Sequence, residues 1–200
     1  MRKNVFGNSA IWVLAIANFF VYIVRYAVLD WGPTLLGEWK GVSIHHAGWM
    51  VAAFEISGIV GMLVAGWATD RFFGGRGPRV CVICMALATV FVALFWGISQ
   101  PPMWLATLLL GAAGFCIYGP QALVGIAAAN IATKKAAATA VGFTGLFGYA
   151  STLVSGWGLG LLAQHYGWNI AVGALILIAI MGTLIFMAAW SAKANGYDND

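Results

Sequence analysis

The sequence predicts an all-α membrane protein with six transmembrane helices, and its composition is the first reason. Hydrophobic residues make up 62% of the 200 residues and charged residues only 8%, and the mean hydropathy is +0.89. A soluble domain usually carries about a quarter charged residues. A water-soluble fold this apolar would expose large hydrophobic patches, so lipid is the expected solvent for much of its surface. We therefore expect no soluble enzyme.

The spacing of the apolar residues is the second reason, because six stretches each approach the ~20 residues that a helix needs to cross the hydrocarbon core. We expect transmembrane helices over residues 10–30, 46–69, 80–98, 103–130, 136–163 and 169–192. A cleavable signal peptide is the alternative for residues 1–30, but that apolar run is too long and no small-residue cleavage site follows it. We expect residues 1–200 to form one six-helix bundle.

The distribution of positive charge predicts how the bundle is oriented. Positive residues in short loops tend to remain on the cytoplasmic side. Of the ten Lys and Arg residues, only Lys40 falls on one side of the bundle and Arg25 lies inside the first helix. The other eight fall on the opposite side: Arg2, Lys3, Arg71, Arg76, Arg79, Lys134, Lys135 and Lys193. We therefore expect both termini in the cytoplasm. The net charge of +4 is too small to suggest a nucleic-acid partner.

Two ionisable residues fall within the expected helices, where a charge is costly and usually faces the bundle interior or a water-filled path. Arg25 lies about fourteen residues into the first helix, roughly 20 Å along its axis. Glu55 lies about nine residues into the second helix, which runs the opposite way, so the two charges reach a similar depth. They could interact directly or through a ligand. A purely structural ion pair of Arg25 with Glu55 or Asp30 is the alternative.

Three tyrosines fall near the same depth. Tyr22 precedes Arg25 by about one turn and shares its face. Tyr118 and Tyr149 lie near the middle of the fourth and fifth helices, where packing between helices is the alternative to a binding role. The helices at 80–98 and 169–192 contain almost no polar residues, so we expect them to face lipid while the other four line a cavity.

Neither a metal nor a cofactor is expected. The Cys81-x-x-Cys84 spacing is that of a redox motif, but it lies in an apolar helix, which favours ordinary packing. His45 and His46 lack a nearby cysteine or carboxylate pair that would complete a metal site.

Several motifs together resemble one transporter family. They are GWATDRFFGGRG at residues 66–77, FVYIVRYAVLDW at 20–31, YGPQ at 118–121, KKAA at 134–137 and GFTGLFGY at 142–149. The first resembles the signature loop of the major facilitator superfamily. In this order, over nearly the whole chain, they resemble the C-terminal half of the organophosphate:phosphate antiporters, most of all the glycerol-3-phosphate transporters.

The resemblance implies one half of a twelve-helix major facilitator fold in the bacterial inner membrane. It also implies exchange of an organic phosphate ester, such as glycerol-3-phosphate, for inorganic phosphate by alternating access. The residues that match the family's substrate-binding positions are Arg25, Tyr22, Tyr118 and Tyr149. Those that match its gating and salt-bridge positions are Asp30, Glu55, Asp70 and Arg71.

Six helices are half of what the family uses, so we expect a partner in the bilayer, either a complementary N-terminal six-helix half or a second copy. The chain is then a truncated product, one part of a split transporter or an excised domain. A membrane sensor of sugar phosphate from the same family is the alternative function, and a non-functional fragment is the third.

Reporter fusions test the expected orientation. Fusions after Lys40, Gln100 and His165 should report the outside, and fusions after Arg79, Lys135 and Lys193 the cytoplasm, because the positive loops resist translocation. Alkaline phosphatase and green fluorescent protein activities at each position give the readout. A consistently reversed pattern would refute the orientation.

Overall fold

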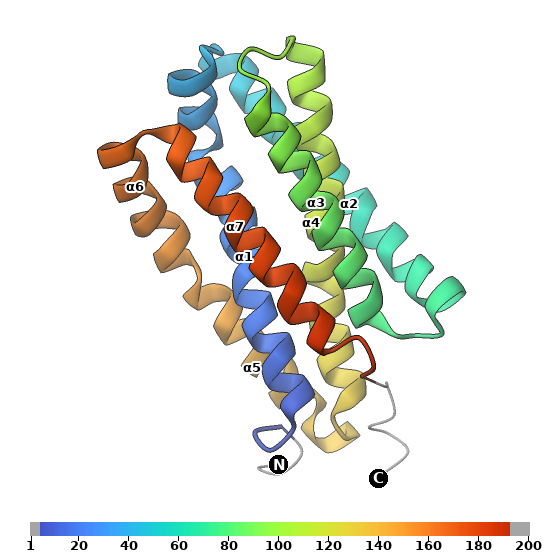
Figure 1. Ribbon diagram of the computed structural model, residues 1–200. Helices are drawn as coiled ribbons and strands as arrows, with labels where there is room; N and C mark the ends of the chain where they lie inside the picture. The colour runs from blue at the N-terminus through green and yellow to red at the C-terminus, as the bar shows by residue number, and fades with distance from the viewer. Residues whose placement is uncertain (1–4, 193–200) are drawn as a thin grey trace.

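The computed structural model describes residues 5–192, and within them the secondary structure is entirely helical. The elements are α1 (Ser9–Lys40), α2 (Ile44–Phe73), α3 (Gly77–Gly97), α4 (Met103–Ile131), η1 (Lys134–Ala136), α5 (Ala137–Ala150), η2 (Val154–Gly158), α6 (Leu159–Tyr166) and α7 (Trp168–Ala188) (Figure 1). The four elements from η1 to α6 follow one another along Lys134–Tyr166, which we call the fifth span. In this part of the chain six helical runs are long and apolar enough to cross a membrane. The predicted all-α, six-helix architecture is confirmed.

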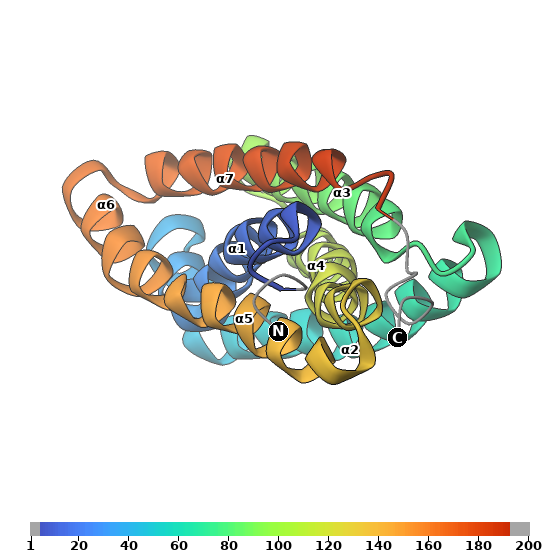
Figure 2. The ribbon, with the colours of Figure 1, turned by 90° about the horizontal axis from the view of Figure 1, so that it is seen from below.

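The helices form three layers, with α1 and α4 in the middle. Figure 2 shows α3 and α7 side by side on one face of this pair, and α2 and the fifth span on the opposite face. α2 and α3 both pack against α4, whereas α7 and α5 both pack against α1. The nearly non-polar helices α3 and α7 thus share one outer layer. The helices that carry the expected polar residues occupy the other two layers.

The two ends of the bundle carry different charges. α1 begins and α7 ends at the same end, which we call the proximal end (Figure 1). The opposite, distal end holds Lys40 and the connections at residues 41–43, 98–102 and 167. The proximal end holds the positive residues Arg71, Arg76, Arg79, Lys134 and Lys135. Arg2, Lys3 and Lys193 lie outside the described residues. The side of the membrane that each end faces stays a prediction.

The first helix is longer than the sequence suggested, because α1 runs on to Lys40 instead of ending near residue 30. Pro33 lies inside the helix and removes one backbone hydrogen bond. The helix continues through it and buries Leu35 and Leu36 in the core. Gly41 caps the helix after Lys40: its φ of 68° is left-handed and its N–H donates to the Gly37 carbonyl at 3.1 Å. Such a left-handed glycine is a common helix end.

The fifth span contains one irregular turn that is fixed by a tryptophan of α1. Over Val154–Gly158 the backbone widens into a π-helix, which misaligns carbonyl groups from their usual partners. The Trp31 Nε1 donates to the carbonyls of Ser155 and Gly156, at 3.0 and 3.2 Å. A Cβ at Gly160 would lie 2.6 Å from the Trp31 ring. The glycine therefore makes room for the indole, which joins α1 to the fifth span.

Glycines let α2 and α4 approach each other closely. A Cβ built at Gly61 would collide with the backbone carbonyl of Phe115, and one at Gly114 would collide with that of Phe54. Association of helices in a bilayer depends on such small residues, because lipid tails leave little hydrophobic driving force between helices. The contact between α2 and α4 thus depends on the absence of side chains at these positions.

Gly61→Ala should destabilise the bundle. The added methyl group meets the backbone of α4, so one helix must shift, at a cost of about 1–3 kcal/mol for overpacking. Thermal unfolding in detergent should show a lower Tm. Gly66→Ala is the matched control, since Gly66 is on the same helix and nothing lies within 4 Å of its Cβ position. Its Tm should be unchanged or slightly higher, and equal losses in both variants would contradict the close contact.

Candidate functional site

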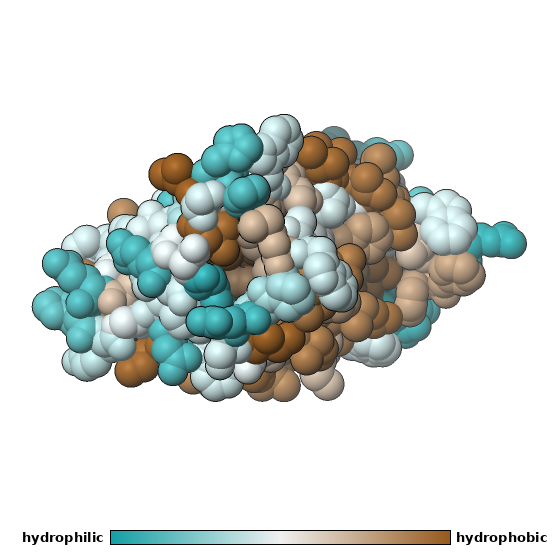
Figure 3. Space-filling view, turned by 90° about the horizontal axis from the view of Figure 1, so that it is seen from above, coloured by the Kyte–Doolittle hydropathy of each residue, from teal (hydrophilic) through white to brown (hydrophobic). Residues whose placement is uncertain are grey.

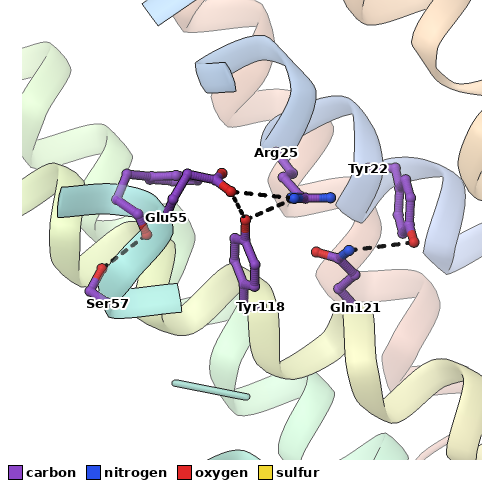
Figure 4. Close-up of polar contacts among 7 residues, drawn as sticks. Tyr22, Arg25, Glu55, Ser57, Tyr118 and Gln121 are labelled. Carbon is purple, nitrogen blue, oxygen red and sulfur yellow. Dashed lines mark hydrogen bonds and ion pairs between the residues drawn. The ribbon is translucent and has the colours of Figure 1, made fainter. Parts of the chain in front are cut away.

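Arg25, Glu55 and Tyr118 meet where α1, α2 and α4 converge (Figure 4). The Arg25 Nη2 donates to the Tyr118 hydroxyl at 2.8 Å and lies 3.5 Å from the Glu55 Oε2. The Tyr118 hydroxyl in turn donates to the same carboxylate oxygen. This is the one ion pair found within residues 5–192. The structure therefore brings together the two charges whose similar depth suggested a contact, and adds the tyrosine between them.

The network is partly exposed and its hydrogen bonding is incomplete. The side chains of Arg25 and Glu55 are 16% and 30% exposed. The guanidinium lies over the ring of Tyr118 at 4.7 Å and near that of Tyr26 at 5.4 Å. The Arg25 Nε and the Glu55 Oε1 are buried and find no hydrogen-bond partner in the protein. Arg25 is thus held in place by a carboxylate and two rings while it still has an unused donor.

The other two expected tyrosines lie beside this network. Tyr22 is one turn before Arg25, and its hydroxyl accepts a long hydrogen bond of 3.5 Å from the Gln121 Nε2 (Figure 4). Its ring contacts that of Tyr149 on α5, with centroids 5.9 Å apart. Tyr149 is 63% exposed. Tyr22 thus connects Tyr149 of α5 and Gln121 of α4 to the face of α1 that carries Arg25.

The sequence analysis missed three polar or aromatic residues of this region. Asn18 and Tyr26 lie one turn on either side of Tyr22, and the Asn18 Nδ2 donates to the Thr144 carbonyl of α5 at 3.0 Å. Gln121 lies three residues after Tyr118, on the same face of α4. The helical spacing of three or four residues from the chosen tyrosines was the signal that could have identified them.

A comparison with known protein families identifies the superfamily of the chain that carries this site. The model of the Major Facilitator Superfamily matches residues 14–196. The chain is a member of the major facilitator superfamily. The resemblance drawn from the motifs is thereby confirmed at the level of the superfamily.

Curated relatives narrow the comparison to phosphate-ester proteins. The Probable hexose phosphate transport protein of Chlamydia pneumoniae is 40% identical over 189 residues, which cover 94% of this chain and 42% of the relative. The Glycerol-3-phosphate transporter of Bacillus subtilis (strain 168) is 37% identical over 190 residues, which cover 94% and 43%. The Membrane sensor protein UhpC of Escherichia coli (strain K12) is 35% identical over 181 residues, which cover 90% and 40%.

The extent of these matches defines which part of a major facilitator protein this is. The chain spans about two fifths of the length of the curated relatives it matches. Together with its six spans, this coverage identifies one half of a major facilitator fold. The relatives are named as transporters or as a sensor, so the family is not one of enzymes. They are named for hexose phosphate as well as for glycerol-3-phosphate, and no single ester stands out among them.

The remaining acidic and basic candidates of this major facilitator chain lie apart from the network. Asp30 is exposed on α1 and forms no ion pair within the described residues. Asp70 and Arg71 are also exposed and likewise unpaired within residues 5–192. They lie about fifteen residues beyond Glu55 on α2, which is roughly 22 Å along the helix. The gating roles that the resemblance implies for these three residues stay predictions.

No cluster of metal-ligating residues accompanies the site in the part of the chain that the structure describes. Residues 5–192 contain no group of three or more His, Cys, Asp or Glu side chains placed to hold a metal ion. Cys81, Cys84 and Cys116 are free thiols. Because the described residues provide no metal cluster, the positive charge that this site offers to an anionic ligand is that of Arg25.

Tyr118→Phe should weaken the bundle by removing the hydroxyl shared between Arg25 and Glu55. Two charged groups in a partly buried site then lose a partner, which costs about 1–3 kcal/mol. Unfolding of the purified chain by titration with a denaturing detergent measures the loss. Tyr149→Phe removes an exposed hydroxyl and should change stability by less than ~0.5 kcal/mol. If Tyr118→Phe lowered the stability as little as Tyr149→Phe does, the Tyr118 hydroxyl would contribute nothing to the stability of the bundle.

Proposed function

We propose that this chain is the C-terminal half of a secondary transporter that exchanges an organic phosphate ester for inorganic phosphate by alternating access. Glycerol-3-phosphate and hexose phosphates are the candidate esters, because the relatives are named for them. The observation that carries the proposal is the placement of Arg25. Its guanidinium lies where three helices meet and its side chain is partly exposed, while its buried Nε has no partner in the protein.

The chemistry of the site suits a phosphoryl group. A guanidinium presents a planar fork of donors that matches two phosphate oxygens, and it stays charged at any physiological pH. Glu55 and Tyr118 balance and orient this charge in the unliganded bundle. Tyr22 and Tyr149 add hydroxyl groups that can donate to further oxygens. One arginine already paired with a carboxylate binds phosphate moderately, as exchange requires, since a very stable complex would stall turnover.

A partner bundle in the bilayer is part of the proposal. Alternating access needs two bundles that rock about a site between them, and this chain supplies one wall. α2 and the fifth span form the outer layer opposite α3 and α7 (Figure 2). Both elements expose large apolar side chains, including Ile56, Ile59, Leu63, Leu146 and Leu153. A complementary six-helix half is the proposed partner, and a second copy is the alternative. We place the assembly in a bacterial inner membrane with both termini in the cytoplasm.

Sensing of a sugar phosphate is the second candidate function. The similarity to the Membrane sensor protein UhpC, at 35% identity, is comparable to that with the transporters. A sensor would need the same phosphate contact at Arg25 but no net movement of substrate. Binding without exchange therefore separates this candidate from the first, and the absence of binding would indicate a non-functional fragment.

Arg25→Lys tests the proposal in the assembled protein. The chain is combined with the N-terminal half of a related transporter in phosphate-loaded vesicles, and exchange of labelled phosphate is followed. We expect exchange from the two halves together and little from the chain alone. Lysine keeps the charge but loses the planar fork, so exchange should fall about 10- to 100-fold, as for the loss of one charged hydrogen bond.

The matched control is Lys135→Arg, a charge-conserving change at an exposed residue of the proximal end. It should leave exchange unchanged. If Arg25→Lys retained full exchange, Arg25 would be a structural ion-pair partner of Glu55. Robust exchange by a monomeric chain alone would refute the need for a second bundle.

A further inference from the structure

Four side-chain atoms within residues 5–192 are buried without a hydrogen-bond partner in the protein, and all four lie on α1, α2 or α4, the helices that meet at Arg25. They are the Asn18 Oδ1, the Arg25 Nε, the Glu55 Oε1 and the Gln121 Oε1. A buried polar atom without a partner destabilises a fold, and native structures contain few of them. Arg25 and Glu55 belong to the proposed phosphate site. Asn18 and Gln121 need an explanation of their own.

Gln121 lies one turn from the Arg25 network, toward the proximal end. It follows Tyr118 by three residues on α4, which is about 4.5 Å along the helix axis. Tyr22 precedes Arg25 by three residues on α1, which runs the opposite way, so the two side chains reach the same depth. The Gln121 Nε2 donates to the Tyr22 hydroxyl at 3.5 Å (Figure 4). An amide and a phenol therefore lie side by side, one turn from the guanidinium.

α5 adds an aromatic surface to this pair. A Cβ at Gly148 would lie 2.9 Å from the Asn18 Nδ2 and 3.2 Å from the Tyr22 ring, so the glycine lets both side chains approach α5. The Tyr22 ring contacts that of Tyr149, with centroids 5.9 Å apart, and Tyr149 is 63% exposed. An open aromatic ring thus lies next to the phenol that the amide contacts.

The hydrogen-bonding capacity of Gln121 is largely unused. A glutamine amide can donate two hydrogen bonds and accept two. The Gln121 amide makes one long bond through its nitrogen, and its oxygen makes none within the protein. The terminal torsion of a glutamine is broad, so this half-buried amide can turn toward a ligand. The Tyr22 hydroxyl accepts the long bond and can still donate its own proton.

Contact with water at the ends of the bundle does not explain these polar groups. Hydrophilic side chains gather at the distal surface on the side where α6 lies, and water satisfies them there (Figure 3). Gln121 lies inside α4, ten residues before its end at Ile131, which is about 15 Å along the axis. Polar side chains at such depth are costly, and they often line the path of a substrate.

We infer that Gln121 and Tyr22 bind the hydroxyl groups in the organic part of the substrate, and that Gln121 makes the site prefer a sugar phosphate to a shorter phosphate ester. The inference rests on the proposed function, because it places the phosphoryl group at Arg25. From there the ester extends one turn toward the proximal end, where the amide exchanges hydrogen bonds with neighbouring ring hydroxyls. The exposed ring of Tyr149 offers its negative face to the C–H groups of the sugar.

A glycerol ester suits this region less well than a hexose ester. It has fewer hydroxyls and no ring to cover the aromatic surface, so part of the amide stays without a partner. A site built to bind a hydroxyl group discriminates against a ligand that lacks it, because the polar groups of the site are then left unpaired.

Equilibrium binding to the two-bundle assembly tests the inference, because binding needs no turnover. The chain is combined with the N-terminal half of a related hexose phosphate transporter and titrated with glucose 6-phosphate, glycerol-3-phosphate and inorganic phosphate. The wild type should prefer glucose 6-phosphate to glycerol-3-phosphate. Gln121→Leu keeps a similar volume without the amide and should lower this preference about tenfold, as for the loss of one or two hydrogen bonds. Its affinity for inorganic phosphate should change less than about twofold, because phosphate does not reach the amide.

Gln100→Leu is the matched control, since it makes the same change at an exposed glutamine of the distal connection. It should leave all three affinities unchanged. An unchanged preference in Gln121→Leu would overturn the inference. An equal loss of affinity for all three ligands would also overturn it, because the amide would then have a structural role.

Failure of the proposed exchange would give a different result. A sensor would show the same affinities and the same effect of Gln121→Leu without moving labelled phosphate, so the inference would stand while the transport function failed. A wild-type assembly that binds no phosphate would refute both.

Discussion

The constraint on which this bundle depends is the positive charge of Arg25 inside an apolar protein. A guanidinium at this depth is stable only where protein groups compensate it, and α2 and α4 each supply one such group. Glu55 and Tyr118 reach the guanidinium together because their helices lie very close. Gly58 shows the connection directly, since a Cβ there would collide with the Tyr118 ring. The glycines that let α2 and α4 pack closely therefore also bring the compensating groups to Arg25.

The same helix that carries the charge is anchored to the fifth span on both sides of it. Asn18 bonds to a carbonyl of α5 toward the proximal end, and Trp31 bonds to two carbonyls of the π turn toward the distal end. Arg25 lies between these anchors. The side chains of the site thus come from helices whose relative positions are fixed by hydrogen bonds in the bundle itself. Flexible connections contribute none of them.

Composition and apolar spacing were enough to predict the architecture, and equal depth was enough to suggest the contact of Arg25 with Glu55. The predicted end of the first helix near residue 30 was wrong. The helix-breaking tendency of Pro33 was outweighed by burial of the residues beyond it. Asp30 follows Arg25 by five residues, which turns it about 140° away around the helix, so proximity in sequence did not bring it to the site. The π turn could not be predicted from the sequence, because small and apolar residues around Val154–Gly158 fit a regular helix equally well.

That π turn sets which side chains of the fifth span face α1. One additional residue in a helix rotates everything after it by about 100°. The rotation in this chain is what presents Gly160 to Trp31. A one-residue deletion within residues 154–158 would restore a regular helix and turn a different side chain toward the indole. The contact with Trp31 therefore depends on the number of residues in this short segment as well as on their identity.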